Sequence, residues 1–259
     1  QELDHVEVLH TIWGIGEQGL RGDQDDSALS GDGESDGAAI EHWVHQVSGS
    51  IVAVEGGALV EMRPLRAVKV DYPGMAPVIC RSVGHPEPIT FMKSMAGLQY
   101  SLNLMDLPRA LIAAVSRVAR RVDQGELSAS EAAAKLDLDV PGGLGLLRSR
   151  LGIGLLFEAV VGARHLPELA AYAEGPRGDT RIRVGAGLTR TPPGGMGGIT
   201  GIPAAIGVGL VGRREVLDLG VLPPERAFAP EAFFELLDPF CVRPAATTEP
   251  LVRVRTGEA

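Results

Sequence analysis

Residues 83–90 form the stretch whose residue types and spacing are best suited to acid–base chemistry. His85 and Glu87 lie two positions apart, and Pro86 and Pro88 flank the glutamate. Proline fixes the backbone φ angle, so this loop is expected to be stiff and to hold both side chains at the end of a strand. A histidine titrates near neutral pH and can donate or accept a proton in catalysis. His85 is therefore the candidate proton-handling residue, and Glu87 would orient it or bind a substrate amine. A turn with an incidental histidine and glutamate is the alternative.

A glycine-rich stretch at residues 191–203 is the second candidate for a binding site, because five of its residues are glycines. A helix is expected to begin near Thr200. Exposed backbone amides and the positive end of the helix dipole would together hold a carboxylate or a phosphate. Gly198, Thr200 and Gly201 are then the candidate substrate-binding residues. The alternative is a flexible linker into a helix that packs closely through its glycines.

Two glycine patterns match the dinucleotide-binding fingerprint G-x-G-x-x-G, at residues 14–19 and 207–212. In a chain with 34 glycines, chance alone supplies about 0.6 such matches. A pyrophosphate site also needs a helix that begins at the glycines. Residues 17–38 instead carry seven carboxylates and one basic residue, which is typical of a mobile acidic loop. The second match falls inside an expected helix, so no cofactor-binding residue is expected in this chain.

His42 and His45 lie three positions apart on an expected helix and would form one edge of a metal site. No further ligand follows at a suitable spacing, and the pair flanks the apolar Trp43. A solvated pair at the edge of the core is the simpler interpretation, and no metal is expected. A metal-dependent hydrolase is the hypothesis that would require a metal here. The chain has neither the G-x-S-x-G nucleophile motif nor the G-x-x-x-x-G-K-[ST] phosphate loop.

Composition and charge exclude several classes of function. The chain has 33 acidic and 24 basic residues, a net charge of −9, and no run of more than two basic residues, so nucleic-acid binding is not expected. It has no stretch of 18 apolar residues and no signal-peptide pattern, so we expect no membrane association and a cytoplasmic location. Cys80 and Cys241 predict two buried free thiols, with one disulfide as the alternative. The first residue, Gln1, suggests a processed product or a fragment.

Hydrophobic periodicity predicts one α/β (α+β) domain over residues 1–259, with a mixed, largely antiparallel sheet covered by helices on one face. A hairpin is expected at residues 50–62 with its turn at Gly56 and Gly57, and a GPRGD turn at residues 175–179. The other expected strands are residues 5–13, 65–70, 77–83, 152–163, 168–174, 180–187 and 251–257. The expected helices are residues 39–47, 107–122, 128–136, which begins with a Ser128–Glu131 capping box, 200–213 and 230–237.

Several of these segments resemble the C-terminal catalytic domain of the saccharopine dehydrogenase-like oxidoreductases, the group of saccharopine reductase and carboxynorspermidine synthase. The strongest similarity runs over residues 200–237, with TGIPAAIGVGL, GVLPPE and PEAFFELL in that order. Weaker similarity lies in the IVAVEGGALVEMRPL hairpin, the turn at residues 71–74 and the HPEPIT loop. Together they cover most of the chain after residue 50.

The resemblance implies a fold similar to the C-terminal domain of glyceraldehyde-3-phosphate dehydrogenase and a separate, N-terminal Rossmann domain. It implies a homodimer in which this domain holds an amino-acid-like substrate over the nicotinamide. The reaction would oxidise or form a C–N bond through an imine, by hydride exchange with NAD or NADP. Arg81 or Arg190 would help the loop at 191–203 to hold the substrate carboxylate.

This sequence departs from the family at its N-terminal end. The Rossmann domain is missing before Gln1, and residues 17–38 look like an acidic insertion. The cofactor therefore belongs to a full-length parent, and the isolated chain is expected to be inactive. A non-enzymatic, stand-alone module for dimerisation or for binding a small amino acid is the alternative. The sequence names neither the substrate nor the choice between NAD and NADP.

Overall fold

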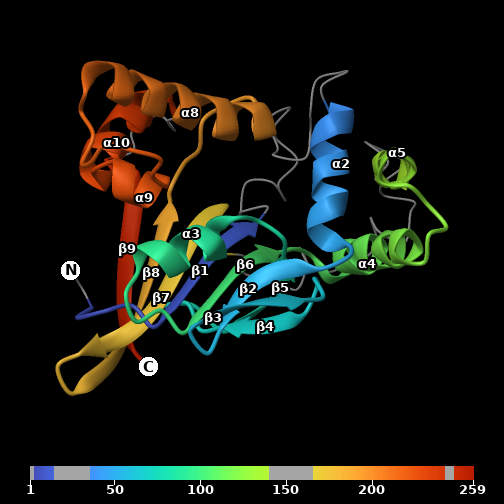
Figure 1. Ribbon diagram of the computed structural model, residues 1–259, viewed down its shortest axis with the longest axis horizontal. Helices are drawn as coiled ribbons and strands as arrows, with labels where there is room; N and C mark the ends of the chain where they lie inside the picture. The colour runs from blue at the N-terminus through green and yellow to red at the C-terminus, as the bar shows by residue number, and fades with distance from the viewer. Residues whose placement is uncertain (1–2, 15–35, 140–165, 243–247) are drawn as a thin grey trace.

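The computed structural model describes residues 3–14, 36–139, 166–242 and 248–259, and a single mixed β-sheet forms its centre (Figure 1). The nine described strands have the order β3-β2-β6-β1-β7-β8-β9, and β4 and β5 form a branch because β5 also pairs with β6. The strands are β1 (Val8–Gly14), β2 (Ile51–Glu55), β3 (Ala58–Met62), β4 (Ala67–Val70), β5 (Val78–Val83), β6 (Tyr100–Asp106), β7 (Leu169–Arg177), β8 (Thr180–Leu188) and β9 (Val252–Glu258).

The parallel pair β1–β6 lies at the centre of the sheet, with Val8 opposite Tyr100 and Gly14 opposite Asp106. All the other pairs between described strands are antiparallel. The expected mixed, largely antiparallel sheet is thus confirmed. The sequence analysis did not predict β6, although this strand pairs with β1, β2 and β5.

Two tight hairpins follow from glycines in the turns. Gly56 and Gly57 join β2 to β3 with φ angles of 60° and 74°, as expected for a two-residue turn that matches the strand twist. Gly178 and Asp179 join β7 to β8, and Gly178 has a φ of 58°. The second turn is therefore shorter than the GPRGD segment expected from the sequence, because β7 continues to Arg177.

Helix α3 (Glu87–Ser94) lies against β2, β3 and β6. Helices α2 (Asp36–Val47), α4 (Arg109–Asp123) and α5 (Ala129–Asp139) pack against one another beside the carboxyl ends of the central strands (Figure 1). The predicted capping box at the start of α5 is confirmed, because Glu131 Oε2 accepts the Ser128 amide at 2.8 Å and Ser128 Oγ accepts the Glu131 amide at 3.2 Å. Helix α3 was not predicted. The main core under these helices consists of Val44, Val47, Val83, Met105, Leu107, Leu111, Val115, Val118, Ala119, Leu127, Ala132 and Ala133.

One face of β8 is covered by the turn that follows β4. Tyr72 is buried in this turn, and its ring lies against the backbone of Gly185 and Gly187. A Cβ atom on Gly185 would lie 2.5 Å from the tyrosine ring, so only glycine leaves room for this contact. The turn therefore packs against the sheet through an aromatic ring over bare backbone.

A C-terminal lobe follows β8 (Figure 1). It contains α8 (Gly195–Arg213), α9 (Pro224–Ala227), α10 (Pro230–Leu237) and the 3-10 helix η1 (Asp238–Phe240). Its small core is built from Leu237, Cys241 and Leu251, against which Leu188, Ile202, Ile206, Phe233 and Phe234 pack. A side-chain hydrogen bond of 2.9 Å, from Ser94 Oγ to Glu225 Oε1, joins α3 to α9. The predicted helices at 200–213 and 230–237 are confirmed, except that α8 begins five residues earlier than expected.

Other expectations have mixed outcomes. Residues 17–35 of the predicted acidic loop and the predicted strand at 152–163 lie outside the described residues, whereas residues 36–38 belong to α2 and not to a loop. Cys80 and Cys241 are both buried and no disulfide joins them, as expected for two thiols. Among the described helices, none is long and apolar enough to cross a bilayer.

Candidate functional site

The structure brings His85 and Glu87 together where β5 ends and α3 begins. Pro86 is the N-cap residue of α3 and Glu87 lies in its first turn, so the two prolines lead into a helix rather than closing a turn. The Glu87 carboxylate forms a hydrogen bond with Nδ1 of His85. The two side chains are 42% and 32% exposed, so a ligand can reach the pair from solvent.

Glu87 favours the protonated form of His85. The hydrogen bond to the carboxylate and its charge raise the pKa of His85 above the ordinary value, although partial burial acts in the opposite direction. Nδ1 bonds to Glu87, and Nε2, the other ring nitrogen, points away from this bond. The pair thus has the geometry of a proton donor oriented by a carboxylate.

The backbone of His85 is held by residues that the sequence analysis did not identify. Asn103 of β6 is only 5% exposed, and its Nδ2 donates to the His85 carbonyl at 2.9 Å. Thr11 lies opposite Asn103 on β1, and its hydroxyl donates to Asn103 Oδ1, which fixes the orientation of the amide. The Gly84 amide donates to the carbonyl of Gln46 at 2.7 Å. Because β6 was not predicted, no sequence signal pointed to Asn103.

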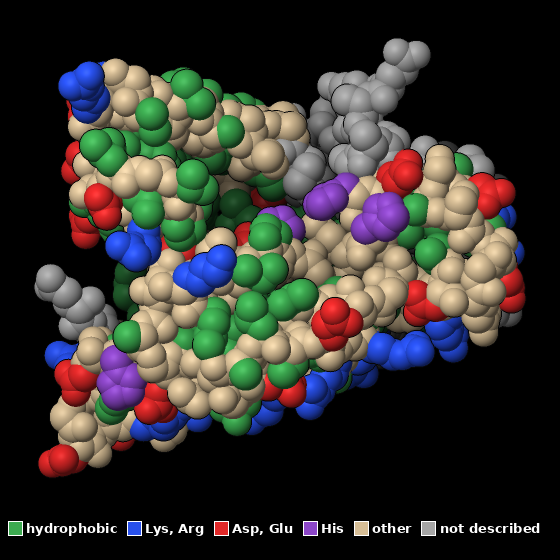
Figure 2. Space-filling view, in the orientation of Figure 1, with side chains coloured by type: hydrophobic (Ala, Val, Ile, Leu, Met, Phe, Trp, Pro, Cys, Tyr) green, Lys and Arg blue, Asp and Glu red, His purple; other side chains and the backbone are tan. Residues whose placement is uncertain are grey.

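Helix α2 adds a second histidine to this region. The ring of His42 lies edge to face with His85, at a centroid separation of 6.4 Å, and its Nε2 is 3.0 Å from Nε2 of Gln46. Figure 2 shows histidine side chains gathered on the surface around the lower part of α2. Across the described ranges, no group of three or more His, Cys, Asp or Glu side chains is placed to hold a metal ion. His42 and His45 therefore belong to no such group there.

The two candidate arginines have protein partners. Arg190 is buried, pairs with Asp238, and donates through Nη1 to the carbonyl of Glu249 at 2.8 Å. Its guanidinium therefore joins the end of β8 to the C-terminal lobe, a structural role that differs from the expected substrate contact. Arg81 is partly buried on β5 and donates to the carbonyl of Leu65 at 3.3 Å.

Gly198, Thr200 and Gly201 do not form the expected loop of exposed amides, because the glycine run is helical from Gly195 onward. The N-cap of α8 is Gly194, with a φ of 90°, and the Gly198 amide already donates to the Gly194 carbonyl at 3.0 Å. All three expected residues lie beyond the first three helical positions. At the start of a helix, the amides of the first residues have no acceptor within the helix. In α8 these are the amides of residues 195–197.

The carboxyl ends of the parallel strands β1 and β6 are tied to the segment before β7. The Gly14 amide donates to the Glu168 carbonyl at 2.9 Å, and Asp106 Oδ2 accepts the Leu166 amide at 2.8 Å. A Cβ on Gly14 would lie 3.3 Å from the Asp106 carbonyl, so this glycine serves close packing of the strands. Burial raises the pKa of Glu168, whose carboxylate accepts the hydroxyl of Thr191 at 3.2 Å.

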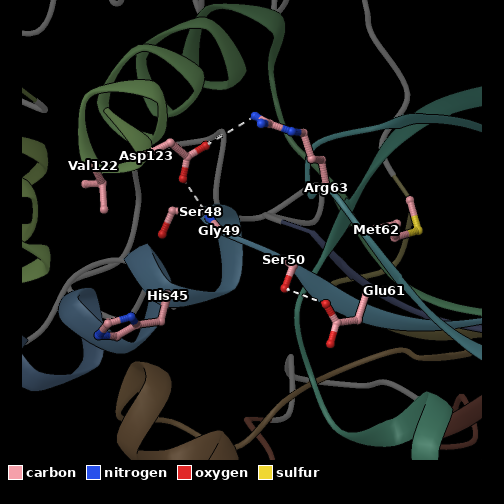
Figure 3. Close-up of a pocket in the computed structure, with 9 residues that line it drawn as sticks. All are labelled: His45, Ser48, Gly49, Ser50, Glu61, Met62, Arg63, Val122 and Asp123. Atoms are coloured by element: carbon pink, nitrogen blue, oxygen red, sulfur yellow. Dashed lines mark hydrogen bonds and ion pairs between the residues drawn. The ribbon is translucent and has the colours of Figure 1, made fainter. Parts of the chain in front are cut away.

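An open cleft of about 780 Å³ lies where α2 and α4 both end beside β3. Figure 3 shows the side chains that line it. Asp123 Oδ1 accepts the Gly49 amide at 2.7 Å, and Arg63 Nη1 lies 3.9 Å from Asp123 Oδ2. The C-terminal ends of α2 and α4, together with the carboxylates of Glu61 and Asp123, favour a ligand with a cationic group. The lining residues are His45, Ser48, Gly49, Ser50, Glu61, Met62, Arg63, Val122 and Asp123, of which the sequence analysis singled out only His45.

No protein-family model matches the chain, and a search of curated proteins found no significant match. What the site can do therefore follows from its own geometry. An exposed histidine with a raised pKa, oriented by a carboxylate and anchored to the central strand by Asn103, is suited to proton transfer.

Proposed function

We propose that this chain is the substrate-binding and dimerisation domain of an NAD(P)-dependent oxidoreductase of the saccharopine dehydrogenase-like kind. Such an enzyme would act on a C–N bond of an amino acid through an imine. The His85–Glu87 pair is the observation that carries the proposal. Imine chemistry needs a proton delivered to and removed from nitrogen or oxygen, and a histidine side chain can do both. The mixed, largely antiparallel sheet supports the proposed similarity to the C-terminal domain of glyceraldehyde-3-phosphate dehydrogenase.

In this proposal His85 exchanges the proton through Nε2, and Glu87 orients the ring. The substrate carboxylate would bind the backbone amides of residues 195–197, at the start of α8, in place of the amides of Gly198, Thr200 and Gly201. Arg81 is the remaining arginine candidate for the same carboxylate, since Arg190 is committed to Asp238. In the view of Figure 1 the first turn of α8 is the end of that helix nearer to α2, the helix that carries His42.

Of the two glycine patterns, residues 15–19 of the first lie outside the described residues, and the amide of Gly14 is bonded to Glu168. The second pattern, at residues 207–212, lies inside α8, where its amides are in helical hydrogen bonds. The nicotinamide cofactor would have to bind to a Rossmann domain outside this chain. The residues of this chain would hold the substrate and move its proton.

A stand-alone module that binds a small molecule without catalysis is the second candidate. The cleft between α2, α4 and β3 favours it, because that cleft has room for a ligand and polar groups to hold one. An amine-bearing ligand would bind to Glu61 and Asp123 there. In that case His85 would be dispensable, and Asp123→Asn would abolish ligand binding.

The decisive experiment uses the full-length product of the gene that encodes this chain. Amino-acid-dependent reduction of NAD or NADP is measured for the wild type and for His85→Ala, which we expect to lower kcat by roughly 100-fold or more. His45→Ala is the matched control and should leave kcat unchanged, because His45 lies in the cleft and not at the Glu87 pair. Intact turnover in His85→Ala would rule out the assigned role.

The coding sequence upstream of residue 1 tests the same proposal independently. A strand, a G-x-G-x-x-G turn and a helix encoded there would support the oxidoreductase. A start codon immediately upstream, with no separate Rossmann subunit, would favour the binding module instead.

A further inference from the structure

The short connection from the last turn of α2 to the start of β2, residues 46–51, is packed against the loop that carries His85. The carbonyl of Gln46 accepts the Gly84 amide at 2.7 Å. A Cβ atom on Gly84 would lie 2.7 Å from Cγ2 of Ile51 and 3.4 Å from the Gln46 carbonyl oxygen, so a side chain at this position has no room. The residue directly before His85 is therefore fixed by the end of α2.

The side chain of Gln46 makes a second link to His85. Its Nε2 lies 3.0 Å from Nε2 of His42, and the His42 ring lies edge to face with the His85 ring at a centroid separation of 6.4 Å. Gln46 thus contacts the loop through the backbone of Gly84 and, by way of His42, the ring of His85. A displacement of the last turn of α2 would move both.

A carboxylate from another helix holds the end of α2. Asp123, the last residue of α4, accepts the Gly49 amide through Oδ1 at 2.7 Å (Figure 3). Gly49 has a φ of 67°, the left-handed conformation that commonly ends a helix, and Oγ of Ser48 donates to the Val44 carbonyl at 2.7 Å. Asp123 is therefore bonded to the connection three residues beyond Gln46.

The apolar core does not extend along the whole connection. Val44 and Val47 are buried in the main core, but Gly49 and Ser50 are exposed. Beyond Val47 the position of the chain depends more on hydrogen bonds, and a bond to a charged acceptor such as Asp123 is about twice as strong as a neutral one.

We propose that Asp123 is a positioning residue for His85. By holding the end of α2, it keeps the Gln46 carbonyl in place to bind Gly84. That bond in turn keeps the His85 ring at the Glu87 carboxylate. The inference rests on the proton-transfer role proposed for His85, and Asp123 would support that role without contacting the substrate.

The effect of Asp123 would pass through the main chain. Among the described residues, Glu87 of α3 and His42 of α2 are the titratable groups in contact with the His85 ring. The carboxylate of Asp123 is bonded instead to the Gly49 amide. Its removal should therefore act on His85 by moving the connection and not by a direct contact of charges.

An NMR titration of the His85 ring in the full 259-residue chain is the first test. In Asp123→Ala we expect the titration midpoint to move to lower pH, towards the ordinary histidine value, because the ring is held less closely at the Glu87 carboxylate. Asp123→Asn keeps a side-chain oxygen that can accept the Gly49 amide, so it should retain the wild-type midpoint.

Glu131→Ala is the matched control for this titration. Glu131 is another carboxylate that accepts a backbone amide, that of Ser128 at 2.8 Å, but it caps α5 and lies outside the connection. Each alanine variant loses one bond of the same kind, so the two should lose similar stability in urea. Only Asp123→Ala should move the midpoint of His85.

Turnover of the full-length enzyme is the second test. We expect kcat to fall roughly 10-fold in Asp123→Ala with KM little changed, since a slightly displaced proton donor slows the chemical step more than it weakens substrate binding. Asp123→Asn should recover most of this loss. A rise in KM with kcat unchanged would instead make the cleft a ligand site, and would overturn the positioning role.

The two tests separate failure of this inference from failure of the proposed function. If His85→Ala leaves turnover intact, the proton-transfer role is lost, but the titration still decides whether Asp123 positions the ring. An unchanged midpoint in folded Asp123→Ala overturns the inference, as does an equal shift in Glu131→Ala or in Asp123→Asn. Should Asp123→Ala not fold, Asp123→Ser takes its place with the same expectation, because its hydroxyl is too short to reach Gly49.

Discussion

At the scale of residues, the acidity of His85 is set by one neighbour two positions along the chain. Glu87 raises the pKa of His85, and Pro86 and Asn103 determine where the two side chains meet. Glu87→Gln keeps a hydrogen-bond acceptor and removes the charge. We expect the pKa of His85 to fall towards its ordinary value in this variant, because the protonated ring loses its counter-charge.

An NMR titration of the His85 ring protons measures that change directly. Glu41→Gln on α2 is a suitable control, because Glu41 has no bond to His85 and its replacement should leave the titration unaltered. In the full-length enzyme, the limb of the pH–rate profile assigned to His85 should move to lower pH in Glu87→Gln. An unchanged His85 titration would show that Glu87 does not control the proton.

At the scale of elements, the sequence predicted what local rules determine and missed what depends on tertiary contacts. The β2–β3 hairpin and the capping box of α5 were predictable because their turn glycines and cap residues act within a few positions. Strand β6 was not, since its polar residues are buried against partners distant in sequence, as Asn103 is against Thr11. Helix α8 was placed too late because its first turn is rich in glycine, a residue that usually breaks helices. The candidate site divides in the same way: His85 and Glu87 follow from the sequence, whereas Asn103, Gln46 and the cleft do not.

A prediction at this scale concerns the contact between β8 and the turn after β4. Gly185→Ala would place a methyl group 2.5 Å from the ring of Tyr72, so the turn must move away from the sheet. Overpacking of this kind costs about 1–3 kcal/mol of unfolding free energy. Gly257→Ala on the neighbouring strand β9 is the control, because its Cβ would lie at an ordinary 3.7 Å from Pro73.

Chemical denaturation of the two glycine variants compares these outcomes. Gly257→Ala should stay within about 0.5 kcal/mol of the wild type, because its methyl group would make only an ordinary contact with Pro73. Equal stability of Gly185→Ala and Gly257→Ala would mean that Tyr72 does not rest on β8.

At the scale of the whole molecule, the central strands β1 and β6 connect function to stability. One face of the pair carries Thr11 and Asn103, which hold the loop of His85, while His10 of β1 points to the opposite face and stacks on Tyr172 at 6.2 Å. A change that weakens this pair should therefore disturb both the candidate site and the fold. We therefore expect the protonation of His10 to make the free energy of unfolding depend on pH.

His10 is 7% exposed, and its Nδ1 accepts the amide of Leu102 at 3.1 Å, a bond that requires the neutral ring. Burial lowers its pKa to about 4. The unfolded chain, with a histidine pKa near 6.5, binds more protons between pH 6.5 and 4, so the free energy of unfolding falls as the pH drops through this window. The contribution is complete above pH 6.5 and amounts to about 3 kcal/mol. Urea unfolding at pH 7 and pH 4.5 should show a smaller acid loss in His10→Gln than in the wild type, whereas His45→Gln, at an exposed position, should retain the wild-type loss. If His10→Gln lost as much stability in acid as the wild type, the buried neutral histidine could not be the source of the pH dependence.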